Sequence, residues 1–304
     1  MNNYPALTKE LFTIRDWLRF TVSRFEESEI FFGHGTDNSY DEAVWLVFSA
    51  LHLPMDTLEN FLEARLTEQE RKYLNSLIQR RINDRTPTAY LLQEAWLQGF
   101  KFYVDERVIV PRSFIAELLV SGLSPWIEYP EMVESAADIC TGSGCLGVLL
   151  ANSFPNATID VIDISPDAID VANINISNYG LEQQIKAIES DMFTELQGKT
   201  YDLIISNPPY VDAPSMAQLP DEYQREPQLA LSSGLDGLDH THTILREAAN
   251  HLNDDGILIV EIGHNRDALL AAYPNVQFFW LEVSSGDEFV FLLSKNQLLS
   301  ISAV

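Results

Sequence analysis

The chain has 304 residues, 46% of them hydrophobic and 21% charged, which suits one large domain or two ordinary ones with a substantial core. No run approaches the ~18 apolar residues of a membrane span, and the N-terminus lacks the basic and apolar regions of a signal peptide. The net charge of −26 argues against nucleic acid as a partner, because nucleic-acid binders usually carry a basic surface.

The acidic excess is greatest after residue 95. Residues 96–304 hold 9 Lys and Arg against 30 Asp and Glu, a balance of −21, whereas residues 1–95 hold 10 against 15. Such a surface attracts a basic protein, although solubility or adaptation to a salty or cold habitat would explain the same charge. The only cysteines, Cys140 and Cys145, lie beside a glycine loop, so we expect no disulfide framework and a cytoplasmic location.

The first 95 residues are predicted to form helices. Apolar residues keep one helical face from Leu7 to Phe25 and again within residues 44–51, 58–62 and 74–82. Thr67 and Glu70 have the spacing of a capping box, so a helix should begin there. Thr86-Pro87 predicts a further turn with the proline at the first helical position. We expect these stripes to form core and not a cofactor site.

The pattern changes between residues 96 and 111. Apolar residues alternate from Phe100 to Val104 and again at Val108 and Val110, with Asp105-Glu106 between the two runs. This alternation predicts a β-hairpin that joins two domains. An apolar helix should follow over residues 115–123.

From residue 136 onward, strands and helices alternate, which predicts a parallel sheet with helices on both faces, an α/β fold. The expected strands are residues 137–140, 158–163, 185–189, 202–206, 256–261, 276–281 and 289–293. The expected helices are residues 145–154, 166–178, 241–252 and 265–273. The stretch 211–240 has no clear period, and a loop of that length in a compact domain is usually functional or disordered. We interpret it as a substrate lid.

A glycine turn follows the first of these strands. Gly142, Gly144 and Gly147 satisfy the pattern G-x-G-x-x-G, and Asp163 ends the next strand about 20 residues later. Glycines let the backbone approach a ligand closely, and Asp163 could hold two ribose hydroxyls. The pattern alone does not separate a dinucleotide from S-adenosylmethionine.

The sequence Asn207-Pro208-Pro209-Tyr210 follows an apolar strand, so it should lie at the carboxyl edge of the sheet, where ligands bind. The Asn207 side-chain oxygen and the Pro208 carbonyl can both accept hydrogen bonds from one planar NH2 group. The two prolines make the turn rigid, and Tyr210 adds a flat face for stacking. The set suits methyl transfer to nitrogen; the plainer alternative is a proline-rich turn.

A second feature favours S-adenosylmethionine. Ser190-Asp191-Met192-Phe193 follows the third strand of the sheet. There an acid, Asp191, and an apolar wall, Met192, could frame an adenine. The alternative for Asp191 is a helix N-cap. No His, Cys, Asp or Glu cluster has the spacing of a metal site.

Together these residues resemble the N5-glutamine methyltransferases that modify translation proteins. The resemblance covers nearly the whole chain and implies a helical, substrate-recognising domain (1–95), a linking hairpin (96–111) and a class I, Rossmann-like methyltransferase domain with a seven-stranded sheet (112–304). The motifs that carry it are Thr141-Gly142-Ser143-Gly144-Cys145 and Asn207-Pro208-Pro209-Tyr210-Val211.

The resemblance also implies the ligands and their residues. S-adenosylmethionine would be the methyl donor and S-adenosylhomocysteine the product. The donor would contact Cys140, Thr141, Gly142, Ser143, Gly144, Asp163, Asp191, Met192 and Asn207. The substrate glutamine amide would lie on Asn207, Pro208, Pro209 and Tyr210, with Asn207, Pro208 and Tyr210 as the catalytic set.

Four stretches indicate the branch of the family. Residues 111–117, 219–227, 233–238 and 286–291 resemble the branch that acts on large-subunit ribosomal protein three, free or early in assembly, with no direct DNA contact and no membrane. Two residues depart from expectation: Arg225 stands in place of His, and Met192 stands where the release-factor branch has Trp. The alternatives are methylation of release factors, adenine-N6 methylation of nucleic acid, and a non-catalytic ribosome-assembly protein.

Overall fold

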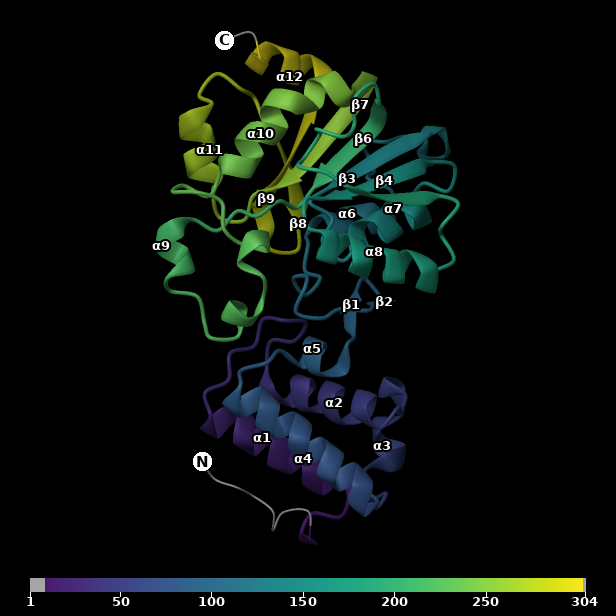
Figure 1. The fold of residues 1–304 in the computed structure, drawn as a ribbon, viewed down its shortest axis with the longest axis vertical. Helices are drawn as coiled ribbons and strands as arrows, with labels where there is room; N and C mark the ends of the chain where they lie inside the picture. Colours follow the sequence, from purple (N-terminus) through teal and green to yellow (C-terminus); the bar gives the residue numbers. More distant parts are fainter. Residues whose placement is uncertain (1–8, 303–304) are drawn as a thin grey trace. The chain divides into compact units, whose positions relative to one another are not determined.

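The computed structural model describes residues 9–302, which form two compact units. The helical unit comprises the chain up to Ala95 together with Pro220–Arg225, and the sheet unit comprises Trp96–Leu219 and the chain from Glu226 onward. Figure 1 shows both units, coloured along the sequence. Nothing in the sequence indicated that residues 220–225 would join the helical unit.

The helical unit packs its helices around one apolar core. The helices are α1 (Ile14–Glu27), α2 (Ser39–Ala50), α3 (Leu58–Phe61), α4 (Glu68–Asn83) and α5 (Thr88–Leu92), with short 3-10 turns at Met55–Thr57 and Tyr223–Arg225. Helix α1 contacts α2 and α4, and α5 contacts α2 and α4. The largest side chains of this core, which include Trp17, Phe25 and Phe48, are fully buried.

The helix starts follow from side-chain caps. The predicted capping box at Thr67 and Glu70 is confirmed. A second box, in which Thr13 pairs with Asp16, starts α1 at Ile14, so Leu11 is buried but precedes the helix. Leu7 lies outside the described residues. The sequence had predicted Pro87 as the first residue of a helix. In the structure Pro87 is the N-cap of α5, one position before the helix, so that prediction was wrong by one residue.

The predicted hairpin is present in a different register. Its strands are β1 (Ala95–Leu97) and β2 (Phe100–Phe102), joined at Gln98 and Gly99. Both linking residues have positive φ, 50° and 79°, which matches the twist of a two-residue hairpin. The chain also turns at residues 105–108, where the Val108 amide donates to the Asp105 carbonyl at 3.2 Å, but no strands pair beside that turn.

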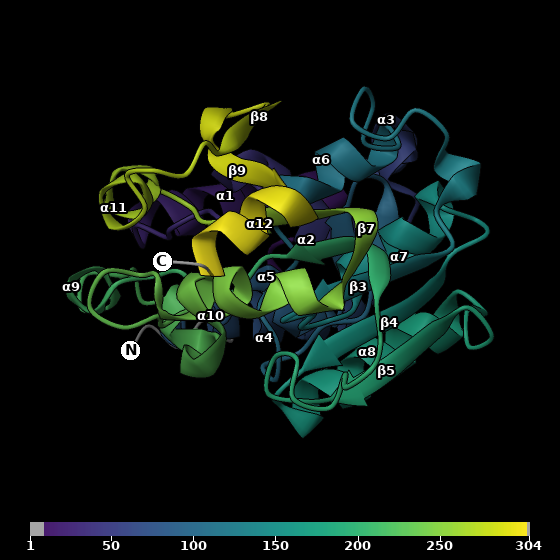
Figure 2. The same cartoon turned by 90° about the horizontal axis from the view of Figure 1, so that it is seen from above.

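The sheet unit contains a twisted sheet with helices on both sides, seen from above in Figure 2. Its strands are β3 (Ser135–Ile139), β4 (Thr158–Asp163), β5 (Ile185–Glu189), β6 (Tyr201–Ser206), β7 (Leu252–Glu261), β8 (Phe279–Val283) and β9 (Gly286–Ser294). Their order is β5-β4-β3-β6-β7-β9-β8, and β9 alone runs antiparallel to β7 and to β8. The predicted seven-stranded α/β sheet is confirmed.

The helices of this unit are α6 (Ile115–Val120), α7 (Cys145–Ser153), α8 (Pro166–Asn178), α9 (Ala213–Met216), α10 (Asp239–Glu247), α11 (Arg266–Ala272) and α12 (Lys295–Ser302), with 3-10 turns at Pro130–Met132, Gln228–Ala230 and Ala248–His251. Helix α7 contacts α6 and α8, and α12 contacts α10 and β7. Across residues 9–302, every helix is too short or too polar to cross a membrane.

Parallel pairing brings the strand ends together. Ile139, the last residue of β3, pairs with Ile162 of β4 on one side and with Ser206 of β6 on the other. Asp163 in turn pairs with Glu189, the last residue of β5. The residues that follow these strands therefore meet at one edge of the sheet, which is where a ligand site is expected.

Candidate active site

The loop after β3 folds through a series of left-handed residues. Cys140, Gly142 and Gly144 have φ values of 61°, 56° and 76°. The Thr141 amide donates to the Ile162 carbonyl at 2.9 Å, which ties the loop to β4. A Cβ on Gly142 would meet nothing within 4 Å, so the backbone conformation explains this glycine.

Gly144 has a packing role. A Cβ there would lie 3.1 Å from Cβ and 3.2 Å from Cα of Ala172, so glycine allows α8 to approach the start of α7. Asp138 lies beneath the loop and accepts a hydrogen bond from the Thr141 hydroxyl at 2.5 Å. Burial raises the pKa of Asp138 to about 7.

Asp163 connects the end of β4 to the glycine loop. One carboxylate oxygen accepts from the Gly142 amide at 2.9 Å and the other from the Ser165 amide at 3.0 Å. Burial raises the pKa of Asp163. Each oxygen has a second lone pair, so the carboxylate can fix the loop and still accept from the hydroxyls of a ligand.

The segment after β5 lies beside Asp163 and the glycine loop. The Ser190 amide donates to the Asp163 carbonyl at 2.9 Å, and Met192 is buried, with its sulfur 3.8 Å from that of Cys140. The Asp191 side chain is exposed. No helix begins at this point of the described chain, so the interpretation of Asp191 as a helix N-cap is not supported.

Asn207 supplies an acceptor that the described residues do not use. It follows β6, whose last residue, Ser206, donates its hydroxyl to the Ile139 carbonyl at 2.7 Å. Asn207 Oδ1 is buried and has no hydrogen-bond partner among residues 9–302. Because a buried carbonyl without a donor is destabilising, this atom is suited to accept from a bound ligand.

Tyr210, the last residue of the Asn-Pro-Pro-Tyr turn, contacts the residues at the end of β7. Its carbonyl accepts from Asn265 Nδ2 at 2.7 Å, and its hydroxyl lies 3.4 Å from Glu261 Oε1. Its ring fills space that a side chain on Gly263 would need, since a Cβ there would lie 2.6 Å from Tyr210 Cε2. These contacts hold the Asn-Pro-Pro-Tyr turn, which follows β6, against the residues at the end of β7.

Glu261 links Tyr210 to the chain that precedes α6. Its Oε2 accepts from the Ser113 hydroxyl at 2.7 Å and from the Phe114 amide at 2.9 Å. The side chain is fully buried, and burial raises the pKa of Glu261 to about 7. Sequence patterns had placed this residue only at the end of an expected strand.

A single cavity gathers most of the predicted residues. Among its lining residues are Cys140, Thr141, Gly142, Ser143, Asp163, Asp191, Met192, Asn207 and Pro209. Gly144, Pro208 and Tyr210 are not among the lining residues.

The cavity also contains residues that the sequence analysis had not placed in the site. These are chiefly Arg107, Arg112, Ser113, Ser190 and His240, together with Pro227, Leu229 and Ala230 of the 211–240 loop. His240 lies in the first turn of α10. Its Nδ1 lies 2.8 Å from the Ser233 hydroxyl, and burial lowers the pKa of the imidazole.

A sheet in this order, with a glycine loop after β3 and Asn-Pro-Pro-Tyr after β6, defines a class I methyltransferase. The family model described as "Methyltransferase small domain" matches residues 116–219.

Full-length relatives identify the family. The ribosomal protein uL3 glutamine methyltransferase of Neisseria gonorrhoeae is 59% identical over 296 residues, which cover 97% of this chain and 99% of the relative. Proteins of the same name from Neisseria meningitidis and Burkholderia pseudomallei are 58% and 50% identical, over 97% and 95% of this chain and 97% of each relative. The chain belongs to the family of ribosomal protein uL3 glutamine methyltransferases. The predicted fold class, enzyme class and branch are thereby confirmed.

Proposed function

We propose that this protein transfers a methyl group from S-adenosylmethionine to the side-chain amide nitrogen, N5, of a glutamine in ribosomal protein uL3, and releases S-adenosylhomocysteine. The observation that carries the proposal is the buried Asn207 Oδ1, an acceptor without a partner among residues 9–302, in a cavity shared with the glycine loop and Asp163. The names of the relatives supply the protein substrate.

The lining residues fit the proposed donor, which when bound supplies an electrophilic methyl group on a sulfonium. The backbone of residues 140–144 would hold its amino-acid end, and Asp163 would accept from the two ribose hydroxyls. Asp191 and Met192 would frame the adenine, with the polarisable Met192 thioether against the ring.

Asn207 and Pro208 would form the amide clamp. The nitrogen of a glutamine side chain is a poor nucleophile because its lone pair is delocalised into the carbonyl. If Asn207 Oδ1 and the Pro208 carbonyl accept its two hydrogens, the lone pair is directed outward and the nitrogen can become pyramidal. Such positioning can lower a barrier by up to ~7–11 kcal/mol in well-oriented reactions. The proton would leave late, to water.

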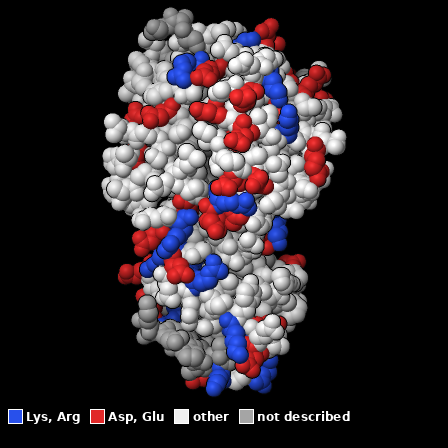
Figure 3. All heavy atoms as spheres, in the orientation of Figure 1, with Lys and Arg blue, Asp and Glu red and all other residues white. Residues whose placement is uncertain are grey.

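The surface charge favours a basic protein over nucleic acid. Figure 3 shows acidic side chains scattered over the face of the sheet unit that it draws, with few Lys and Arg among them. The whole stretch 96–304 has a balance of −21. A phosphate backbone would be repelled by such a surface, whereas a basic ribosomal protein would be attracted. We place the reaction on free uL3 in the cytoplasm.

One assay tests the proposal directly. The enzyme and tritiated S-adenosylmethionine are incubated in three separate reactions: with free uL3, with a release factor and with DNA. Label should enter uL3 alone and should be found on the side-chain nitrogen of a single glutamine. Label in the release factor or in DNA, with none in uL3, would overturn the assignment.

A further inference from the structure

A short piece of the loop after Asn-Pro-Pro-Tyr belongs to the helical unit. The loop runs from the end of β6 to the start of α10, and most of it lies in the sheet unit. Its residues Pro220–Arg225, which we name the strap, are part of the helical unit instead. The contacts of two consecutive strap residues, Glu222 and Tyr223, explain why.

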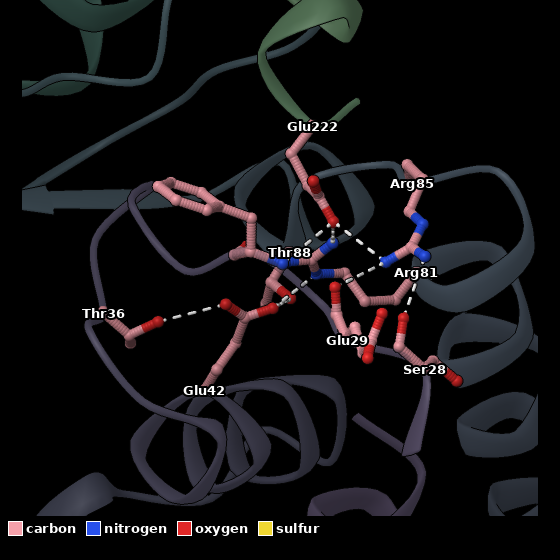
Figure 4. Close-up of polar contacts among 9 residues, drawn as sticks. Ser28, Glu29, Thr36, Glu42, Arg81, Arg85, Thr88 and Glu222 are labelled. Atoms are coloured by element: carbon pink, nitrogen blue, oxygen red, sulfur yellow. Dashed lines mark hydrogen bonds and ion pairs between the residues drawn. The ribbon is translucent and has the colours of Figure 1, made fainter. Parts of the chain in front are cut away.

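Glu222 is the charged anchor of the strap. Its side chain is 3% exposed, and one oxygen, Oε1, accepts from the Phe31 amide at 3.2 Å. The same oxygen lies 3.2 Å from Nη1 of Arg81 and 3.4 Å from Nη1 of Arg85. Figure 4 shows the Glu222 side chain reaching down from the strap to both arginines.

Arg81 makes this anchor part of a buried ionic network. The Arg81 side chain is 1% exposed, and its Nε lies 2.5 Å from Glu42 Oε1, while Nη2 donates to the Phe31 carbonyl at 2.9 Å. Glu42 also accepts from the Thr88 hydroxyl at 2.7 Å. Two carboxylates thus face two guanidinium groups, and because buried charges are costly unless paired, the helical unit depends on Glu222 to complete the set.

Tyr223 adds an anchor based on shape. Its ring centroid lies 5.8 Å from that of Phe31 and 4.4 Å from that of His34. A Cβ on Gly33 would lie 2.7 Å from the Tyr223 hydroxyl, so the glycine leaves room for the tyrosine. The strap is therefore bound through both charge and packing.

The chain reaches the active-site cavity directly after the strap. Glu226 lies in the sheet unit, where its two carboxylate oxygens are 2.6 and 2.5 Å from the Nη atoms of Arg112. The next residues, Pro227, Leu229 and Ala230, line the cavity. Only three residues separate Glu222 from Glu226, so release of Glu222 would remove one of the two anchors that hold this end of the segment with the lining residues.

We propose that Glu222 is a positioning residue: by seating the strap in the helical unit, it holds the 211–240 loop in the conformation that accepts the glutamine-bearing protein. The proposal rests on the proposed function, because it concerns the loop beside that active site. In this proposal the role of the helical unit is to retain the loop that lines part of the cavity.

The sequence offers a direct readout of the strap. Arg225 is exposed and is the only Lys or Arg within residues 211–240, so trypsin can cut this loop at one bond only. The test variant is Glu222→Gln, which keeps the shape of the side chain and removes its charge. The matched control is Asp221→Asn, which removes the same charge from the exposed neighbouring residue.

Two measurements follow on the full-length enzyme. Glu222→Gln should speed tryptic cleavage after Arg225 about tenfold or more, because cleavage follows the open population of the loop. It should also raise KM for uL3 about tenfold or more, with calorimetric affinity for S-adenosylmethionine within about twofold of wild type. Asp221→Asn should change neither value. If Glu222→Gln does not fold, Tyr223→Ala, which removes the packing anchor and leaves the charges, serves in its place.

Several results would overturn the proposal. One is an unchanged cleavage rate; another is faster cleavage with unchanged KM and kcat for uL3. A parallel loss of donor affinity and substrate affinity would indicate general disorder and would also contradict it. Failure of the wild-type enzyme to methylate uL3 would refute the proposed function instead, and the cleavage rate would still decide whether Glu222 holds the strap.

Discussion

Asn207 is the residue on which the chemistry depends. Its Oδ1 is buried without a partner among the described residues, next to a cavity lined by the glycine loop. Asn207→Ala removes this acceptor and leaves Pro208-Pro209 to form the turn. If the clamp acts mainly in the transition state, kcat should fall about 10²-fold or more, about 2.7 kcal/mol or more, with a smaller change in KM for uL3.

Donor affinity needs its own measurement in this variant, because the family resemblance places Asn207 near the donor as well. Calorimetry with S-adenosylmethionine provides it, and kcat is then taken at saturating donor and substrate. Turnover close to wild type under those conditions would reduce Asn207 to a turn residue.

Asp163 tests the donor assignment. Its carboxylate accepts from the Gly142 and Ser165 amides and lines the cavity. Asp163→Ala should weaken donor binding about tenfold or more, since charge-assisted hydrogen bonds are worth roughly 1.5–3 kcal/mol each. Asp160→Asn, three residues earlier in the same strand, is the control for charge and should leave donor affinity unchanged. Equal donor affinity in a folded Asp163→Ala protein would remove Asp163 from the donor site.

At the scale of elements, α7 lies on β4 through Gly147. A Cβ at Gly147 would lie 2.3 Å from Cγ1 of Val161, a fully buried β-branched residue with little freedom to rotate. Alanine would gain up to about 1 kcal/mol of helix propensity, but overpacking costs roughly 1–3 kcal/mol. Gly147→Ala should therefore lower the free energy of unfolding.

A double-mutant cycle isolates the contact. In the Val161→Ala background the obstructing methyl is gone, so Gly147→Ala should become neutral or stabilising, with a coupling of about 1–3 kcal/mol in urea unfolding. Additive effects of the two substitutions would show that the helix and the strand do not meet at this pair.

The sequence predicted elements well where a local pattern was sufficient. Short runs that contain Ile or Val and lie next to turn residues predict strands, so β4 and β5 were predicted with their observed bounds. The hairpin was predicted in the wrong register, because nothing marks Gln98 as a residue with positive φ. The strap could not be predicted, since Glu222 meets Arg81 across 141 positions of the chain.

The same distinction applies to the candidate site. Asp163 and Asn207 end or follow strands, so topology alone brings them to one edge. Glu261 also ends a strand, but its partner Ser113 lies 148 positions away and only the folded chain joins them. Sequence patterns therefore predicted the strand-end residues of the cavity, and the residues contributed by distant loops required the structure.

At the scale of the whole molecule, Glu261 should make stability depend on pH. Burial raises the pKa of Glu261 in the folded protein from 4.5 to about 7. Between these values the folded state keeps a proton that the unfolded state has lost, so the free energy of unfolding falls as pH rises. The full effect is about 3 kcal/mol, at 1.36 kcal/mol per pKa unit.

Glu261→Gln removes this titration and leaves that of the similarly buried Asp138 in place. The stability of the variant relative to wild type should therefore increase between about pH 5 and about pH 8, as measured by urea unfolding. If the free energy of unfolding differs between variant and wild type by the same amount at about pH 5 and about pH 8, Glu261 keeps its ordinary pKa in the folded protein.

The net charge of the molecule predicts how it meets its substrate. The balance of −21 over residues 96–304 should attract a basic ribosomal protein from a distance. The Debye length falls from about 30 Å at 0.01 M to about 8 Å at 0.15 M ionic strength, so stopped-flow association rates with uL3 should fall across this range. Turnover at saturating uL3 is the control, because it contains no encounter step and should vary little. Association rates that do not change with salt would contradict steering and would leave the acidic surface to solubility.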